Sequence, residues 1–149
     1  MYMWCSYCAT LLSKISGPLL DRIDLHVEVT PVEFSELSSS RITEKSNSIR
    51  QRVMFAREIQ KARYTHQPHI HSNAQMSSKL VREVCQIDEK GTLLLKNAME
   101  RLNLSARAYD RILKVARTIA DMEGSDQIQN QHLAEAIQFR SLDRENWAG

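Results

Sequence analysis

Glycine and proline are scarce in this 149-residue sequence, which contains only four glycines and three prolines. No run of the form Gly-x-x-x-x-Gly-Lys-Ser/Thr occurs, and no strand pattern ends in paired acidic residues suited to a magnesium ion. The first absence removes the backbone cradle that holds nucleotide phosphates in P-loop proteins, and the second removes the ligands of their metal. The chain therefore cannot hold a nucleotide by itself in the P-loop manner.

Cysteine is also rare, with three residues, Cys5, Cys8 and Cys85. An odd number without a disulfide framework fits a reducing compartment, so we expect a cytoplasmic protein. Cys5-x-x-Cys8 is half of a zinc-binding pattern without an evident second half. Completing it would require the fold to bring in the histidines of one loop, His66, His69 and His71. We predict that these histidines are solvent-exposed, that no metal is bound, and that Cys85 is a small core residue.

Neither charge nor hydrophobicity is extreme, since the net charge is +2 and hydrophobic residues make up 42% of the chain. The near-neutral balance argues against a dedicated polycationic arm for nucleic acid. Aromatic residues are only 6%, so the core must consist mainly of Leu, Ile, Val and Ala. The apolar opening, residues 1–12, is too short for a membrane helix and lacks the basic start of a signal peptide.

One stretch, Ser16 to Val29, has strand character. Gly17 and Pro18 form a chain break, after which apolar and polar residues alternate from residue 25 to residue 29, the period of a half-buried strand. Arg22 stands between two aspartates at the start of this strand, a placement suited to a phosphate-facing arginine. Because a single strand cannot satisfy its own hydrogen bonds, we interpret the chain as a fragment whose sheet partners are missing.

The remainder, after a serine-rich connection at residues 35–43, is predicted to be helical, so the expected fold class is mainly α. Helices are expected over Glu44 to Tyr64, Ser77 or Ser78 to Val84, Glu89 to Leu102, Ser105 to Gly124 and Gln131 to Arg140. Ser105 is a good N-cap, and Gly124 is typical of a helix end. Three helices carry apolar stripes at three- and four-residue steps. The stripes are Ile49, Val53, Ala56 and Ile59; Tyr109, Ile112, Leu113, Ala116, Ile119 and Ala120; and Leu133, Ala136 and Ile137.

Two blocks of sequence are specific enough to indicate a family. They read Ser-Gly-Pro-Leu-Leu-Asp-Arg-Ile-Asp-Leu-His-Val-Glu-Val at residues 16–29 and Leu-Ser-Ala-Arg-Ala-Tyr-Asp-Arg-Ile-Leu-Lys-Val-Ala-Arg-Thr-Ile-Ala-Asp at residues 104–121. Together with His-Leu-Ala-Glu-Ala-Ile-Gln-Phe-Arg at residues 132–140, they closely resemble magnesium-chelatase-like AAA+ ATPases, in particular the ComM (YifB) competence-associated branch. The resemblance covers residues 15–144.

This resemblance implies a carboxy-terminal helical lid preceded by one orphan strand from a truncated ATPase core. Residues 1–34 are then the remnant of the core, residues 35–43 a linker and residues 44–149 the lid. The implied parent protein binds ATP and Mg²⁺ and forms an AAA+ ring, expected to be a hexamer, that acts on DNA as a helicase or in branch migration. No membrane partner is implied. The lid by itself is expected to be inactive and to bind no cofactor tightly.

The resemblance also implies roles for two arginines. Arg22 matches the arginine finger of the Leu-Leu-Asp-Arg motif, which reaches the γ-phosphate bound by a neighbouring subunit and stabilises transition-state charge. Arg107, in Leu-Ser-Ala-Arg, matches the sensor-2 arginine, which reports the nucleotide state to the lid. Its position in the first turn of a capped helix independently favours an anion. Whether Arg107 acts in cis or in trans stays open.

Residue type alone allows other roles. Arg22 would then be a structural ion-pair partner of Asp21 or Asp24. Arg107 would be a solvated residue at a helix start. Three further cations on the same helix are interpreted as a solvated face, with a polar ring around nucleotide or a contact to the DNA backbone as the alternative: Arg111, Lys114 and Arg117.

The whole chain also has alternative interpretations. The basic helices and the helix-turn-helix spacing at residues 102–105 are compatible with a stand-alone DNA-binding module. A subunit of a true magnesium chelatase, acting on a porphyrin, is the other alternative.

Two acidic residues are expected to be charge partners, Asp110 and Glu123.

Overall fold

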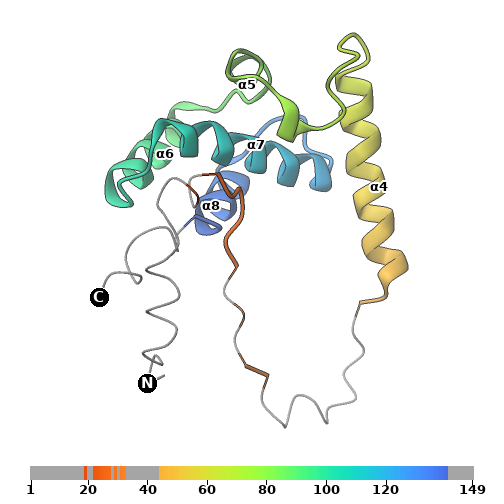
Figure 1. The fold of residues 1–149 in the computed structure, drawn as a ribbon, viewed down its shortest axis with the longest axis horizontal. Helices are drawn as coiled ribbons and strands as arrows, with labels where there is room; N and C mark the ends of the chain where they lie inside the picture. The colour runs from red at the N-terminus through yellow and green to blue at the C-terminus, as the bar shows by residue number, and fades with distance from the viewer. Residues whose placement is uncertain (1–18, 20–21, 28, 30, 33–43, 141–149) are drawn as a thin grey trace.

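The computed structural model describes residues 19, 22–27, 29, 31–32 and 44–140. Within them, five α-helices and one 3-10 turn follow in order: α4 (Ser46–Arg63), η1 (Asn73–Gln75), α5 (Ser78–Val84), α6 (Glu89–Arg101), α7 (Ala106–Glu123) and α8 (Asn130–Gln138). The described residues contain no β-strand (Figure 1). The predicted mainly α fold is therefore confirmed.

Local sequence explains where three of these helices begin. Ser77, Asp88 and Ser105 are N-caps whose side-chain oxygens accept hydrogen bonds from the amides of Leu80, Gly91 and Ala108. Each bond satisfies one backbone donor that the first helical turn leaves without a partner. The predicted cap at Ser105 is confirmed, and of the two serines predicted to begin α5 the cap is Ser77.

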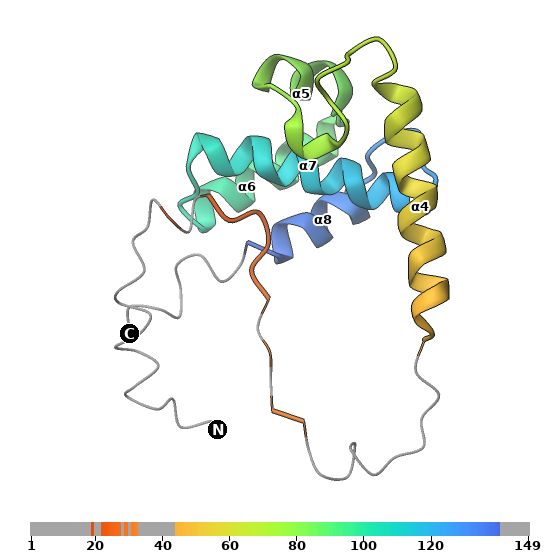
Figure 2. The same ribbon diagram turned by 45° about the vertical axis from the view of Figure 1, so that its right-hand side comes forward.

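Helix α7 is the centre of the molecule. It packs against α4, α5, α8 and η1, while α6 packs against α8 (Figure 2). Four of its buried apolar residues belong to the predicted stripe, namely Ile112, Leu113, Ala116 and Ala120, whereas buried Ala108 was not predicted and Ile119 is only partly buried. Tyr109, which was predicted to belong to the stripe, is instead 38% exposed. The periodicity identified the inward face correctly, but it could not show that neighbouring elements leave this amphipathic ring partly uncovered.

Helix α4 is covered over only part of its length. Ala56 and Gln60 are buried near its C-terminal half, whereas Ile49 and Val53 are 45% and 43% exposed. In both ribbon views the Ser46 end of α4 extends beyond α7 (Figures 1 and 2). Only the second half of the predicted stripe therefore contributes to the core. The prediction missed this because hydrophobic periodicity shows which face of a helix is apolar, but not how far a neighbouring helix covers that face.

The segment preceding α4 contacts the helices without forming a ladder. No strand is assigned at residues 22–27 or at Val29, and Glu28 lies outside the described residues. The amide of His26 donates a hydrogen bond of 2.9 Å to the carbonyl of Phe139, which follows α8. The serine-rich connection at residues 35–43 and the pair Cys5 and Cys8 also lie outside the described part.

Candidate functional site

A cavity of about 290 Å³ lies beside the N-terminal half of α7. Six residues line it: Asp24, Ala74, Arg107, Asp110, Arg111 and Lys114. Four of these come from α7 at spacings of three and four residues, which places them on one helical face. The fold thus brings three sequence-predicted residues together, namely Arg107, Arg111 and Lys114.

Arg107 is the second residue of α7, and it is exposed. The side chain of Ser105 caps this helix by accepting a 3.3 Å hydrogen bond from the amide of Ala108. Two properties then favour an anion here, the positive end of an 18-residue helix and a permanently charged guanidinium.

The other charged residues of the cavity already have partners. Arg111 forms an ion pair with Asp24, and the Lys114 amine donates a 3.0 Å hydrogen bond to the carbonyl of Ala74. Asp110 accepts a 2.5 Å hydrogen bond from the Ser78 hydroxyl. Three cations and two carboxylates line the cavity, which therefore carries a net charge of +1.

Arg22, the other predicted site residue, is exposed and lies outside this cavity. Its amide donates a 2.9 Å hydrogen bond to the carbonyl of Leu19. Asp24, two residues later, makes its ion pair with Arg111 on α7. The structure therefore attaches the Arg22 segment to the same helix that carries Arg107.

Arg117 does not belong to the exposed group, and its interpretation as part of a solvated face is wrong. Its side chain is 2% exposed and its Nε donates a 3.0 Å hydrogen bond to Asp121. The two terminal nitrogens donate to the carbonyls of Asp126 and Ser125 at 2.9 Å and 2.5 Å. Arg117 is a structural residue because the loop after α7 folds back over this part of the helix and supplies acceptors.

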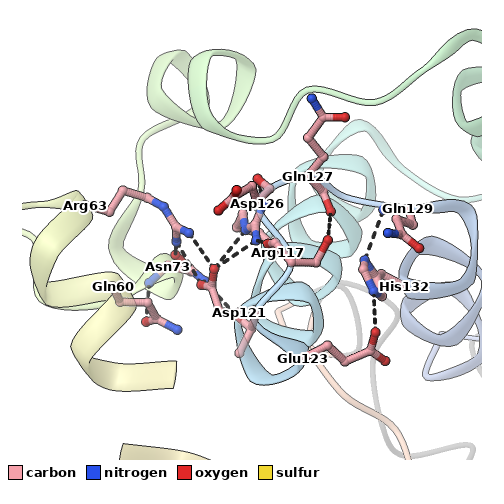
Figure 3. A network of polar contacts seen from close by, with 12 residues as sticks. Gln60, Arg63, Asn73, Arg117, Asp121, Glu123, Asp126, Gln127, Gln129 and His132 are labelled. Atoms are coloured by element: carbon pink, nitrogen blue, oxygen red, sulfur yellow. Dashed lines mark hydrogen bonds and ion pairs between the residues drawn. The ribbon is translucent and has the colours of Figure 1, made fainter. Parts of the chain in front are cut away.

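Asp121 is the centre of a buried polar network that sequence reasoning missed (Figure 3). Its carboxylate accepts hydrogen bonds from two arginines, one from Arg117 at 3.0 Å and two from Arg63 at 2.8 Å and 2.5 Å. Asn73 donates a further bond of 2.8 Å. A possible signal was present, since Arg117 and Asp121 are an oppositely charged i, i+4 pair inside an otherwise apolar stretch.

The ionisation of this network follows from its geometry. Burial alone would raise the pKa of Asp121, but hydrogen bonds from Arg63 and Asn73, and the charges of Arg63 and Arg117, lower it overall. The hydrogen bond to Asp121 in turn raises the pKa of Arg63. The network therefore consists of ionised side chains, and its ion pairs and hydrogen bonds connect α4, η1 and α7.

Other predicted side chains have ordinary roles. His66, His69 and His71 are exposed, as expected. Cys85 is buried, as predicted, and burial raises the pKa of its thiol to about 12. Glu123 accepts a 2.8 Å hydrogen bond from the Nε2 of buried His132, and its role as a charge partner stays a prediction.

Two kinds of site or segment are absent from the part of the chain that the structure describes. No three His, Cys, Asp or Glu side chains gather there closely enough to hold a metal ion. In the same residues, no helix combines the length and hydrophobicity needed to cross a membrane.

Two family models match this chain. The model described as magnesium chelatase, subunit ChlI C-terminal, matches residues 43–140, which is more than half of the chain. The model described as magnesium chelatase, subunit ChlI, matches residues 4–37. The cavity residues are divided between them, because Asp24 lies in the second match and the α7 residues lie in the first.

Curated relatives agree with these matches. The chain is 41% identical over 134 residues to Competence protein ComM of Haemophilus influenzae and, over the same length, to the uncharacterised protein YifB of Escherichia coli. It is 37% identical over 130 residues to an uncharacterised protein of Mycobacterium tuberculosis. These alignments include 87–89% of this chain but only 25–26% of each relative. The chain thus spans about a quarter of the length of the relatives it matches.

Proposed function

This chain belongs to the magnesium chelatase family, and from that premise we propose that it forms the helical lid of an AAA+ ATPase. In this proposal Arg107 contacts a phosphate of ATP as the sensor-2 residue. Arg22 is an arginine finger that reaches ATP held by a neighbouring subunit. The observation that carries the proposal is the cavity beside α7, where exposed Arg107 stands at a capped helix start.

The residues of the cavity fit a phosphate group. Its net charge of +1 and the amides of the first turn of α7 both attract an anion. No group of three His, Cys, Asp or Glu side chains that could hold Mg²⁺ occurs among the described residues. In this proposal the rest of the parent ATPase binds the metal. ATP bound there would supply the phosphoryl group, and this chain would supply positive charge.

We further propose a ring of subunits, a hexamer, that works on DNA. The name of the Haemophilus influenzae relative, a competence protein, supports DNA over a porphyrin as the substrate. Arg111 and Lys114 would add to the phosphate-attracting surface, with nucleotide or the DNA backbone as its ligand. A stand-alone helix-turn-helix module has less support, since the helix after the turn is α7, which packs against α4, α5, α8 and η1.

The experiment uses a chimeric ATPase, in which this chain replaces the matched residues of the Haemophilus influenzae protein. Arg22→Ala is expected to lower ATP turnover about 1,000-fold, as for other arginine fingers. Arg107→Ala is expected to lower it about 100-fold, the cost of one lost charge-stabilising donor. Arg82→Ala, at an exposed arginine of α5, is the matched control and retains full turnover. Branched DNA is expected to raise the turnover of the unsubstituted chimera, whereas a porphyrin is not.

Mixing subunits tests where each arginine acts. If Arg22 acts in trans and Arg107 in cis, Arg22→Ala and Arg107→Ala subunits restore turnover when mixed. The reason is that an Arg22→Ala subunit keeps its own Arg107 and receives an intact finger from its Arg107→Ala neighbour. No restoration in the mixture, with each variant inactive alone, rules out this division of roles. Unchanged turnover in both single variants contradicts the proposed function.

A further inference from the structure

The segment that carries Arg22 is fastened to the helices at three nearby positions. The carbonyl of Ile23 accepts a hydrogen bond from Arg140, Asp24 forms an ion pair with Arg111, and the His26 amide donates to the Phe139 carbonyl. We call these three contacts the clamp. Residues 22–27 accordingly lie beside α7 and α8 in both ribbon views (Figures 1 and 2).

We propose that the clamp couples Arg22 to the nucleotide cavity, with Asp24 and Arg111 as positioning residues. This inference rests on the proposed roles of Arg22 and Arg107. Through the clamp, the presence or absence of ATP phosphate beside Arg107 of one subunit would control the position of Arg22 of that same subunit. The position of Arg22 in turn affects the ATP site of the neighbouring subunit.

The first step of the coupling is electrostatic. Arg111 lies four residues after Arg107 on α7, about 6 Å along the helix axis, and both line the cavity with Asp24. A phosphate beside Arg107 competes with the Asp24 carboxylate for the Arg111 guanidinium, because both are anions that bind the same planar fork. The Arg111 and Asp24 side chains are 28% and 45% exposed, so an entering ligand can reach them.

The second step is geometric. Arg22 is two residues from Asp24, so their Cα atoms stay within about 7.6 Å of each other. Arg140, which holds the intervening Ile23 carbonyl, is buried and anchored after α8. The clamp therefore fixes the position of the Arg22 Cα atom, from which the exposed side chain extends. If the clamp loosens, the Arg22 guanidinium moves away from the ATP of the neighbouring subunit.

The test is Asp24→Asn in the chimeric ATPase, which removes the ion pair but keeps the size of the side chain. ATP turnover is expected to fall between about 10-fold and 100-fold, as for a catalytic group that is misplaced but present. The KM for ATP should not rise, because the subunit's own Arg107 is intact and Arg111 no longer has a competing carboxylate. Asp126→Asn, at an exposed aspartate that is bonded only through its backbone carbonyl, is the matched control.

Mixed rings show where the defect acts. Asp24→Asn subunits are expected to regain turnover with Arg107→Ala subunits and not with Arg22→Ala subunits, because the clamp acts on the neighbour's site. The opposite pattern, or no restoration with either partner, overturns the clamp. Unchanged turnover in Asp24→Asn does so too.

Failure of the clamp is distinguishable from failure of the proposed function. If Arg22→Ala and Arg107→Ala still complement each other, the arginine roles stand and only the coupling is lost. If those two variants fail to complement, the premise itself is wrong.

Discussion

Arg111 and Arg117 are both arginines of α7 paired with an aspartate, yet their side chains are 28% and 2% exposed. The difference lies in the face of the helix from which each projects. Arg111 shares its face and its cavity with Arg107, whereas Arg117 is buried and bonded to carbonyls of the loop that follows α7. The exposed pair is available to a ligand, and the buried pair serves the fold.

Asp121 is the residue whose loss should cost most in stability. Asp121→Asn leaves the guanidinium groups of Arg63 and Arg117 without their shared carboxylate. Removing one partner of such a buried pair costs about 3 kcal/mol or more in free energy of unfolding, measured by urea denaturation. Glu100→Gln, in an exposed pair with Lys96, should cost less than about 1 kcal/mol. Equal effects in the two variants would contradict the role of the network.

The same carboxylate predicts how stability depends on pH. The pKa of Asp121 is lowered in the folded state, so its contribution is present at every pH above the unfolded value of about 4. It is lost as the pH falls from there through the folded-state pKa. Free energies of unfolding of wild type and Asp121→Asn are therefore expected to converge in acid, whereas a constant difference down to pH 2 would rule out this linkage.

At the scale of elements, α7 is defined by its two ends as much as by its stripe. Ser105 starts it, and Gly124 ends it in the left-handed conformation with φ of 72°. The backbone amide of Ser125 then returns to the carbonyl of Ala120 at 2.9 Å. The chain is thereby turned toward the loop whose carbonyls hold Arg117, so the helix end and the buried network depend on each other.

Gly124→Ala tests this helix end. A Cβ atom at this position lies 3.3 Å from the Phe55 ring, and the alanine must also adopt the positive φ of 72°. The expected loss is about 1–2 kcal/mol in free energy of unfolding, seen as a lower melting temperature. Gly124→Asn should lose less, because asparagine tolerates the left-handed region better than alanine. If both variants melt with the wild type, the conformation of this residue does not limit stability.

At the scale of the whole molecule, the helices are not held equally. Helix α4 packs against α7 through its second half, with Arg63 bonded to Asp121 and the Gln60 side chain bonded to the Asn73 amide. By contrast, α7 and α8 pack closely, and α6 packs against α8. We therefore expect α4 to open separately from the other helices.

Arg63→Gln is the variant that tests this independence. Hydrogen exchange in α4 should become faster, while exchange in α6 and α8 stays nearly unchanged, because only α4 loses its bidentate contact with Asp121. Arg57→Gln, at an exposed position of the same helix, is the matched control. Faster exchange in all helices would show that the network holds the entire fold.

Much of this molecule was predictable from sequence. The five helices, the cap at Ser105 and the end at Gly124 followed from local patterns and were confirmed, with helix bounds that differ from the predicted ones by at most two residues. These features depend on residues within a few positions of each other, so their physics is contained in the sequence window. Of the four cations predicted to share one side of α7, Arg107, Arg111 and Lys114 do line one cavity, whereas Arg117 does not.

Only the tertiary structure decided the rest. The burial of Arg117, the partial exposure of Tyr109 and the uncovered half of α4 depend on which distant segment lies over each helix. The pairing of Asp24 with Arg111 joins residues 87 positions apart, and that of Arg63 with Asp121 joins residues 58 apart. Such contacts form only when packing of the apolar faces has brought the helices together, because an exposed ion pair contributes too little to set the fold by itself. The sequence by itself therefore determined the helices and their polar and apolar faces, and packing determined which charges became structural and which stayed open to a ligand.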